Sequence, residues 1–260
     1  MTKTGRFGTI LNGFVARKVR GKKMTKYKIA DIVFEAETKY AYTGKLCEKF
    51  VYTGEEEPVF SAVITDSDVE RERKGLNAPE PLLESIALQR KFCEYVLKNG
   101  NGTIFHSSAV AYKGEAYLFT APSGTGKSTH TRLWKEMLGD KLTYIDDDKP
   151  IIRYIDGEFY VYGTPWNGKH HLGGNVKAKL KCVCKIYQAK ENTIRKAEIP
   201  EMIGVVFNQT LRPEQAEDME KLLSLTDKLL TKSNLYALGC NISREAAELS
   251  FTTMTGEKIC

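Results

Sequence analysis

The sequence predicts an α/β fold in which helices pack around a mixed, largely antiparallel sheet. Two pairs of apolar stretches, each joined by a tight Gly-containing turn, are typical of antiparallel hairpins. A strand, a Gly-rich loop and a helix follow one another over residues 115–138. Elsewhere apolar residues recur at helical spacing, as expected for helices that cover a sheet. A chain of 260 residues with 42% hydrophobic side chains can bury a sizeable core.

The opening of the chain is strongly basic. Nine of the 39 Lys and Arg residues lie in residues 1–28, where there is no acid, so the rest carries 30 bases against 33 acids. The net charge of +6 therefore does not indicate a nucleic-acid-binding body, and no nucleic-acid partner is expected. We expect residues 1–26 to form a basic tail, flexible or disordered. The alternatives are a surface-binding amphipathic segment, an organelle-targeting sequence, or a start codon assigned too early, since Met24 opens a strand-like stretch.

Residues 27–75 are expected to form a small β-rich segment. Short apolar stretches, punctuated by Gly44 and Gly54, predict strands at residues 27–37, 50–52 and 59–64. The charged stretch at residues 66–74 is interpreted as a solvated connection.

Residues 76–260 are expected to form a single core. Pro79 and Pro81 can start a helix without wasting an amide, and Asn99-Gly100 ends the apolar helical spacing that follows. The elements predicted after this helix are hairpins at 103–120 and 151–162, a strand at 142–145, a loop at 163–171, strands at 180–187 and 235–240, helices over 200–231, and a helix that opens at Ser243.

The six cysteines are scattered, and there is no hydrophobic export signal, which predicts free thiols and a cytoplasmic location. Cys182 and Cys184 are interpreted as buried strand positions, because no second Cys or His pair at zinc-finger spacing accompanies them. No apolar run approaches the roughly 20 residues that cross a bilayer, so no membrane span is expected.

Residues 121–128, Ala-Pro-Ser-Gly-Thr-Gly-Lys-Ser, fit the phosphate-loop (P-loop) pattern between a strand and a helix. Small residues in the loop let backbone amides curl around a phosphate, and the following helix adds the positive end of its dipole. Lys127 is expected to reach the β and γ phosphates, and Ser128 to bind Mg²⁺. We therefore expect ATP and Mg²⁺ here, with nucleotide contacts from Ser123, Gly124, Thr125, Gly126, Lys127, Ser128 and Thr129.

Three aspartates, Asp146, Asp147 and Asp148, follow this loop at the end of a predicted strand. That placement delivers carboxylates to the sheet edge where phosphates and a metal would lie. One carboxylate can hold Mg²⁺, and another can accept the proton of an attacking hydroxyl. A solvated acidic turn is the alternative, although consecutive aspartates repel one another unless a cation is present.

Four segments carry a family resemblance: Phe-His-Ser-Ser at 105–108, Pro-Ser-Gly-Thr-Gly-Lys-Ser-Thr-His at 122–130, Asp-Asp-Lys-Pro at 147–150 and Gly-Thr-Pro-Trp at 163–166. Over about residues 103–190 the chain resembles the HPr kinase/phosphorylase and phosphoenolpyruvate carboxykinase superfamily, and within it the small carboxykinase-related proteins. The resemblance implies a phosphate loop between hairpin strands and a kinase activity. Thr129-His130 replace the acidic residue that follows the loop in HPr kinases, so an acceptor other than HPr is expected.

The resemblance also implies roles for individual residues. Asp147 matches the proton shuttle, Asp148 the carboxylate near the metal, and His106 the histidine beside the phosphate site. Together with Lys127 these are the expected catalytic residues. Candidate substrate contacts, chosen for their places on the helical turn after the loop and in the 163–171 loop, are His130, Trp166, Lys169 and His170. A basic surface loop is the alternative reading of the 163–171 loop.

The expected function is ATP-dependent phosphorylation of a hydroxyl, with a Ser of a peptide or protein as the acceptor. A small-molecule hydroxyl kinase is the second hypothesis, which a closed pocket at residues 163–171 would favour. A regulatory module that binds nucleotide without turnover is the third, and the complete set of loop lysine, loop serine and paired aspartates counts against it. Whether the chain forms a homo-oligomer stays open.

Overall fold

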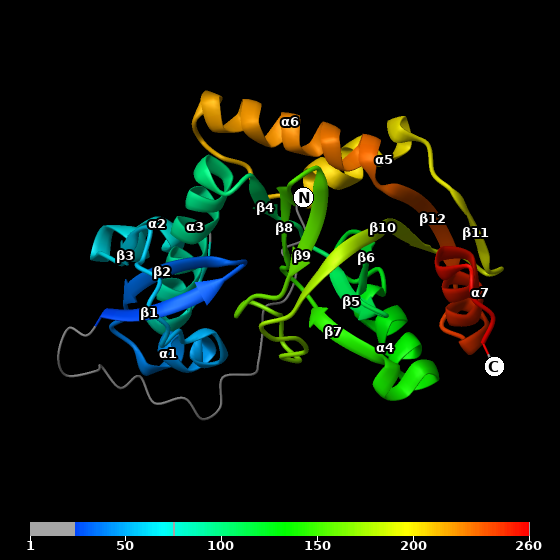
Figure 1. Ribbon diagram of the computed structural model, residues 1–260, viewed down its shortest axis with the longest axis horizontal. Helices are drawn as coiled ribbons and strands as arrows, with labels where there is room; N and C mark the ends of the chain where they lie inside the picture. The colour runs from blue at the N-terminus through cyan, green and yellow to red at the C-terminus, as the bar shows by residue number, and fades with distance from the viewer. Residues whose placement is uncertain (1–23, 75, 260) are drawn as a thin grey trace.

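The computed structural model describes residues 24–74 and 76–259. Residues 1–23, most of the expected basic tail, lie outside the described residues. The described chain is an α/β fold with a three-stranded sheet near its start and a nine-stranded mixed sheet after it (Figure 1). The predicted mixed α/β class is therefore confirmed.

The first sheet has the strand order β1-β2-β3, in which β1 pairs antiparallel with β2 and β2 pairs parallel with β3. Its strands are β1 (Met24–Ile29), β2 (Ile32–Glu37) and β3 (Ser61–Val63). The helical elements of this part are α1 (Ala41–Leu46), the 3-10 turn η1 (Glu48–Phe50), α2 (Asp66–Arg73) and α3 (Glu80–Asn99).

Two expectations for this part are wrong. The stretch read as a solvated connection forms helix α2, because Thr65 and Asp68 close a capping box at its start. Arg90 of α3 then pairs with Asp68 at 3.0 Å and with Glu72 at 2.6 Å, which holds the charged helix against α3. The strand expected at residues 50–52 is replaced by the end of η1 and one isolated bridge.

The large sheet follows the order β4-β8-β9-β10-β6-β5-β7, with β12 beside β10 and β11 beside β12. Among the described strands of this sheet, only the pairs β10–β6 and β10–β12 are parallel. The strands are β4 (Gly102–Ile104), β5 (Ser108–Tyr112), β6 (Glu115–Thr120), β7 (Leu142–Asp146), β8 (Ile151–Ile155), β9 (Glu158–Tyr162), β10 (Lys177–Gln188), β11 (Thr193–Lys196) and β12 (Asn234–Cys240).

Both predicted hairpins are present, although the start of the first one forms the separate strand β4, which pairs with β8 instead. Lys113 and Gly114 between β5 and β6 have φ of 50° and 80°, and Asp156 and Gly157 between β8 and β9 have φ of 49° and 85°. Two successive residues at positive φ match the twist of a tight antiparallel hairpin. The short edge strand β11 was not predicted, because its charged sequence lacks an apolar face.

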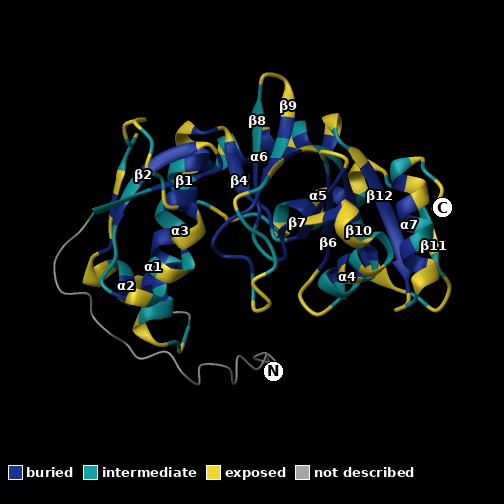
Figure 2. Cartoon of the chain, turned by 60° about the horizontal axis from the view of Figure 1, so that its bottom comes forward, coloured by how far each residue is buried: buried dark blue, intermediate teal, exposed yellow. Residues whose placement is uncertain are grey.

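Alternating side chains of the large sheet divide its core into two layers. In β6, Leu118 packs with α5 and α6, whereas Phe119 packs with α4 and α7, because successive strand residues point to opposite faces. These helices are α4 (Lys127–Leu138), α5 (Ile199–Asn208), α6 (Ala216–Lys232) and α7 (Arg244–Thr255), and the 3-10 turn η2 (Gly139–Lys141) follows α4. Figure 2 shows the buried strands between them, with the β8–β9 turn exposed at the periphery.

Cys182 and Cys184 are buried on β10, as predicted, and burial raises the pKa of both thiols. Among the described helices, none has both the length and the apolar character to cross a bilayer.

Trp166 joins the early part of the chain, from β1 to α3, to the large sheet. Its side chain is 7% exposed and belongs to a core cluster that contains Phe34 and Phe92 from the early part and Tyr162 from β9. The indole Nε1 donates to the backbone oxygen and the hydroxyl of Ser85 in α3, at 3.2 Å each. The expectation that Trp166 contacts substrate is therefore not supported, because the ring is used to pack the loop onto α3.

Trp166→Phe should lower the free energy of unfolding by about 1–2 kcal/mol, because it deletes the indole donor and leaves Ser85 without that partner. Nucleotide affinity should stay unchanged. Urea unfolding and ATP titration of the variant would measure both quantities, with Tyr187→Phe on the exposed part of β10 as the matched control. Unchanged stability together with a weakened substrate interaction would return Trp166 to the substrate site.

Candidate active site

The Gly-rich loop at residues 121–126 connects β6 to α4. Gly124 and Gly126 have φ of 80° and 119°, a backbone region that side chains with a Cβ rarely adopt. Gly126 is the N-cap of α4 and provides no side-chain hydrogen bond to the first amides of the helix. Helix N-termini with free amides attract anions, so this end of α4 fits a phosphate.

Lys127 lies between the loop and the aspartates. Its Nζ donates to the backbone oxygen of Ala121 at 2.9 Å, across the base of the loop. Burial lowers the pKa of Lys127, while the nearby carboxylates of Asp148 and Asp147 act in the opposite direction. The ammonium group is therefore close to both carboxylates and to the loop that would surround a phosphate.

Asp147 is held against the loop by hydroxyl groups. Its Oδ1 accepts from Ser108 Oγ of β5 at 2.6 Å, and the nearby Ser128 side chain also favours the ionised carboxylate. The residue is 6% exposed. Burial raises the pKa of Asp147, and these hydrogen bonds only partly offset the effect. A buried carboxylate with hydroxyl partners beside the loop serine is a suitable neighbour for a cation.

Asp148 faces a different set of groups. His106 Nε2 lies 3.1 Å from its Oδ1, and the two side chains are each about one-third exposed. Burial opposes ionisation of Asp148, but the hydrogen bond from His106 and the charges of Lys149 and Lys127 together lower its pKa. His106 is fixed by its own backbone, since its N–H donates to Gln209 O at 2.7 Å just after α5. Asp148 is thus ionised and open to solvent.

Asp146, to which the sequence analysis assigned no role, has a third environment. It is fully buried at the end of β7. Its Oδ1 accepts from the backbone N–H groups of Asp148 and Lys149, and its Oδ2 accepts from Thr164 N–H, at 2.8–2.9 Å. Burial raises the pKa of Asp146 to about 7, with these hydrogen bonds opposing the shift. A signal in the sequence exists, since Asp commonly accepts from amides two or three residues ahead.

The exposed half of the 163–171 loop reaches the carboxylates. Gly168 has φ of 75°, and a Cβ placed on it would lie 3.0 Å from the Cβ of Asp148. Lys169 and His170 are exposed, and a positive charge on His170 lowers the pKa of Asp147. The structure therefore places the predicted His170 near the aspartates, and Lys169 precedes it on the exposed part of the loop.

The remaining predicted residues divide into two groups. Ser123 and Gly124 are exposed at the tip of the loop, and Thr125, Gly126, Ser128 and Thr129 are half-buried around it. His130 instead turns into the core, where its Nε2 lies 2.8 Å from Ser250 Oγ of α7. Burial lowers the pKa of His130 to about 4. The expectation that His130 contacts substrate is not supported, because its ring faces α7 rather than the loop.

These residues fit a nucleotide with Mg²⁺. In the part of the chain that the structure describes, no group of three or more His, Cys, Asp and Glu side chains is arranged to hold a metal. A nucleotide-bound Mg²⁺ does not need such a group, because it takes one or two carboxylates together with phosphate oxygens and waters. Ser128 and the neighbouring Asp147 supply hydroxyl and carboxylate oxygens of that kind.

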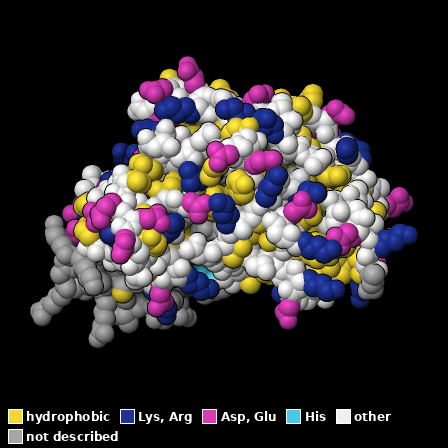
Figure 3. Space-filling view, in the orientation of Figure 1, with side chains coloured by type: hydrophobic (Ala, Val, Ile, Leu, Met, Phe, Trp, Pro, Cys, Tyr) yellow, Lys and Arg dark blue, Asp and Glu magenta, His cyan; other side chains and the backbone are white. Residues whose placement is uncertain are grey.

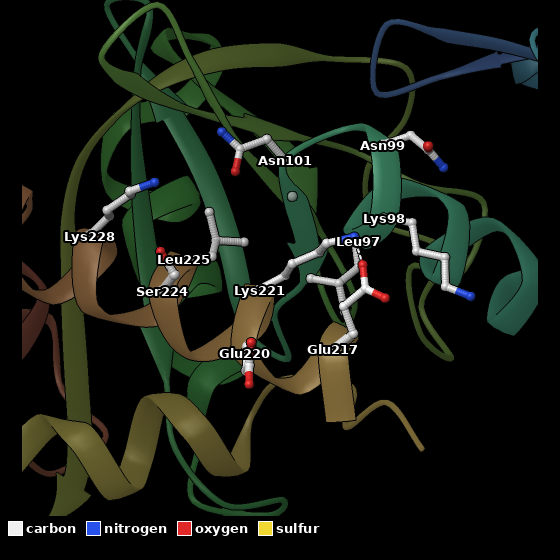
Figure 4. Close-up of a pocket in the computed structure, with 11 residues that line it drawn as sticks. Leu97, Lys98, Asn99, Asn101, Glu217, Glu220, Lys221, Ser224, Leu225 and Lys228 are labelled. Carbon is white, nitrogen blue, oxygen red and sulfur yellow. Dashed lines mark ion pairs between the residues drawn. The ribbon is translucent and has the colours of Figure 1, made fainter. Parts of the chain in front are cut away.

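A cavity of about 420 Å³ lies elsewhere, between the end of α3 and α6 (Figure 4). Leu97 and Leu225 provide apolar surface, and Lys221 pairs with Glu217 at 3.3 Å. Lys98 pairs with Asp218, so two of the lysines here are matched by acids. None of the predicted site residues lines this cavity. On the face shown in Figure 3, acidic and basic side chains are likewise interspersed.

Comparisons with known proteins give little beyond this geometry. No protein-family model and no curated protein matches the chain. Among solved structures, the Hpr(Ser) kinase/phosphatase from Coxiella burnetii is similar, with a TM-score of 0.35 and 7% sequence identity. The match covers 59% of this chain and 97% of that one. The likeness is remote, and the site rests on its own residues.

Proposed function

We propose that this chain is an ATP-dependent phosphotransferase that phosphorylates a hydroxyl, with a Ser side chain of a peptide or protein as the acceptor. The observation that carries the proposal is the position of the buried Asp147 carboxylate against Ser128, at the N-terminus of α4 and beside Lys127. Phosphoryl transfer depends mainly on positioning and charge neutralisation, and this arrangement offers both.

The loop amides and Lys127 would bind the phosphates, while Ser128 and Asp147 would hold Mg²⁺, which neutralises phosphate charge when bound. In this proposal Asp148, backed by His106, accepts the proton of the acceptor hydroxyl. The roles of the two aspartates are thus exchanged relative to those implied by the resemblance. Two observations support the exchange: Asp147 lies against Ser128 and is 6% exposed, whereas the Asp148 side chain is 32% exposed.

A peptide or protein acceptor is favoured over a small molecule by the form of the 163–171 loop. Residues 163–167 are buried, but Lys169, His170 and His171 are exposed, and Gly168 and His170 lie near the carboxylates. A side chain projecting from a larger acceptor can reach Asp148 there. Incubation with ATP labelled on the γ phosphate and fractionated lysate would test the acceptor class. Label in peptide fractions supports the proposal, label in small molecules supports the alternative kinase, and binding without transfer supports a regulatory module.

Lys127→Ala should reduce turnover by about 10³-fold, because it removes the positive charge next to the transferred phosphate. The measurement is ATP turnover at saturating Mg²⁺. Lys190→Ala, an exposed lysine after β10, is the control and should be fully active. Normal turnover by Lys127→Ala would show that the 121–128 segment is not the active site.

Asp147→Asn and Asp148→Asn should differ in their response to metal. Asp147→Asn should raise the Mg²⁺ concentration required, and added Mg²⁺ should restore part of its activity. Asp148→Asn should keep nucleotide affinity near that of the unchanged protein while kcat falls by about 10²-fold, without rescue by metal.

A Mg²⁺ titration of ATP affinity and turnover for both variants measures this difference. The reverse pattern would restore the assignment implied by the resemblance. Equal defects, both reversed by metal, would mean that both carboxylates serve the cation and that the base lies elsewhere.

A further inference from the structure

The third aspartate, Asp146, has a specific hydrogen-bonding arrangement that none of the roles above uses. Its carboxylate is fully buried, and the donors to its two oxygens are uncharged: three backbone N–H groups and the Thr164 hydroxyl. Burying a carboxylate without a cationic partner is costly unless such donors are in place. The burial of Asp146 therefore depends on these four donors.

We infer that Asp146 is a positioning residue for both catalytic carboxylates, an inference that rests on the proposed function. Its Oδ1 accepts from the amides of Asp148 and Lys149, which closes a tight turn directly after β7. That turn separates the neighbouring side chains, so that Asp147 meets Ser108 and Asp148 meets His106. Asp146 touches neither of the proposed reacting groups, and it acts through the backbone of the residues that do.

The second oxygen extends this control to the 163–171 loop. Thr164 N–H and Oγ1 both lie 2.9 Å from Asp146 Oδ2, and the same Oγ1 lies 3.0 Å from Lys149 O. Trp166 N–H donates to Thr164 Oγ1 at 3.1 Å. Asp147 N–H donates to Leu172 O at 3.1 Å on the far side of the loop. The turn with the carboxylates and the loop beside them therefore form one hydrogen-bonded unit centred on Asp146.

Graded substitutions test the inference. Asp146→Ala removes all four interactions and should lower kcat by about 10²-fold, the loss expected when reacting groups shift by about 1 Å. Asp146→Asn keeps one oxygen for the turn but sets an NH₂ against Thr164 N–H, so a loss of about 10-fold is expected. The kcat of Thr164→Val should lie between that of the unchanged protein and that of Asp146→Ala. Affinity for metal-free ATP, which depends on the 121–126 loop, should stay within about 3-fold of the value for the unchanged protein in all three variants.

Asp227→Ala and Asp227→Asn, at an exposed position on α6, are the matched controls and should be fully active. Assays are run well below the melting temperature of each variant. Undiminished kcat in a folded Asp146→Ala, or an equal loss of metal-free ATP affinity, would overturn the inference. If Asp146→Ala does not fold, the kcat and the metal-free ATP affinity of Asp146→Asn and Thr164→Val test the inference by the same criteria.

Hydrogen exchange separates this inference from the proposed function. The amides of residues 148 and 149 should exchange faster in Asp146→Asn than in the unchanged protein, whether or not the chain transfers phosphate. An inactive unchanged protein would remove the proposed function and leave this measurement to decide whether Asp146 orders the turn. Unchanged exchange at these two amides would refute the positioning role in either case.

Discussion

Three consecutive carboxylates at the end of one strand are the constraint around which this site is arranged. Like charges so close together repel, and the protein lowers the cost by giving each a different kind of partner. Asp146 receives backbone amides, Asp147 receives hydroxyls, and Asp148 receives His106 and nearby lysines. The three groups consequently differ in burial and in proton affinity although they are identical in chemistry.

The geometry of the sheet makes this division feasible. Strand β5 lies between β6, which leads into the Gly-rich loop, and β7, which ends at the aspartates. The register between β5 and β7 shifts between Ala109 and Val110, directly beside Ser108. Such irregularities redirect side chains next to functional sites. The hydroxyl of Ser108 is thereby placed to bridge Asp147 and Thr131 of α4.

Local patterns in the sequence were enough to predict the elements whose conformation depends on neighbouring residues. The hairpins follow from turn residues that tolerate positive φ, and the loop before α4 follows from its glycines. Helix α2 was missed because a single buried residue, Val69, gives it no apolar periodicity. The surroundings of His130 and Trp166 could not be inferred, because their partners Ser250 and Ser85 are 120 and 81 residues away in the chain. The different surroundings of the three aspartates could not be inferred for the same reason, since Thr164, Ser108 and His106 come next to them only after folding.

The core cluster that holds Trp166 has a thermodynamic consequence. Phe34 and Phe92 of the early part pack in the same cluster as Ile151 and Tyr162 of the large sheet. Both parts therefore contribute side chains to one shared hydrophobic core. Two parts that share a core cannot lose it separately, and their unfolding is expected to be a single cooperative transition. A destabilising substitution in the first sheet should therefore lower the fraction of folded molecules. It should leave the chemistry of the aspartates unchanged in the molecules that remain folded.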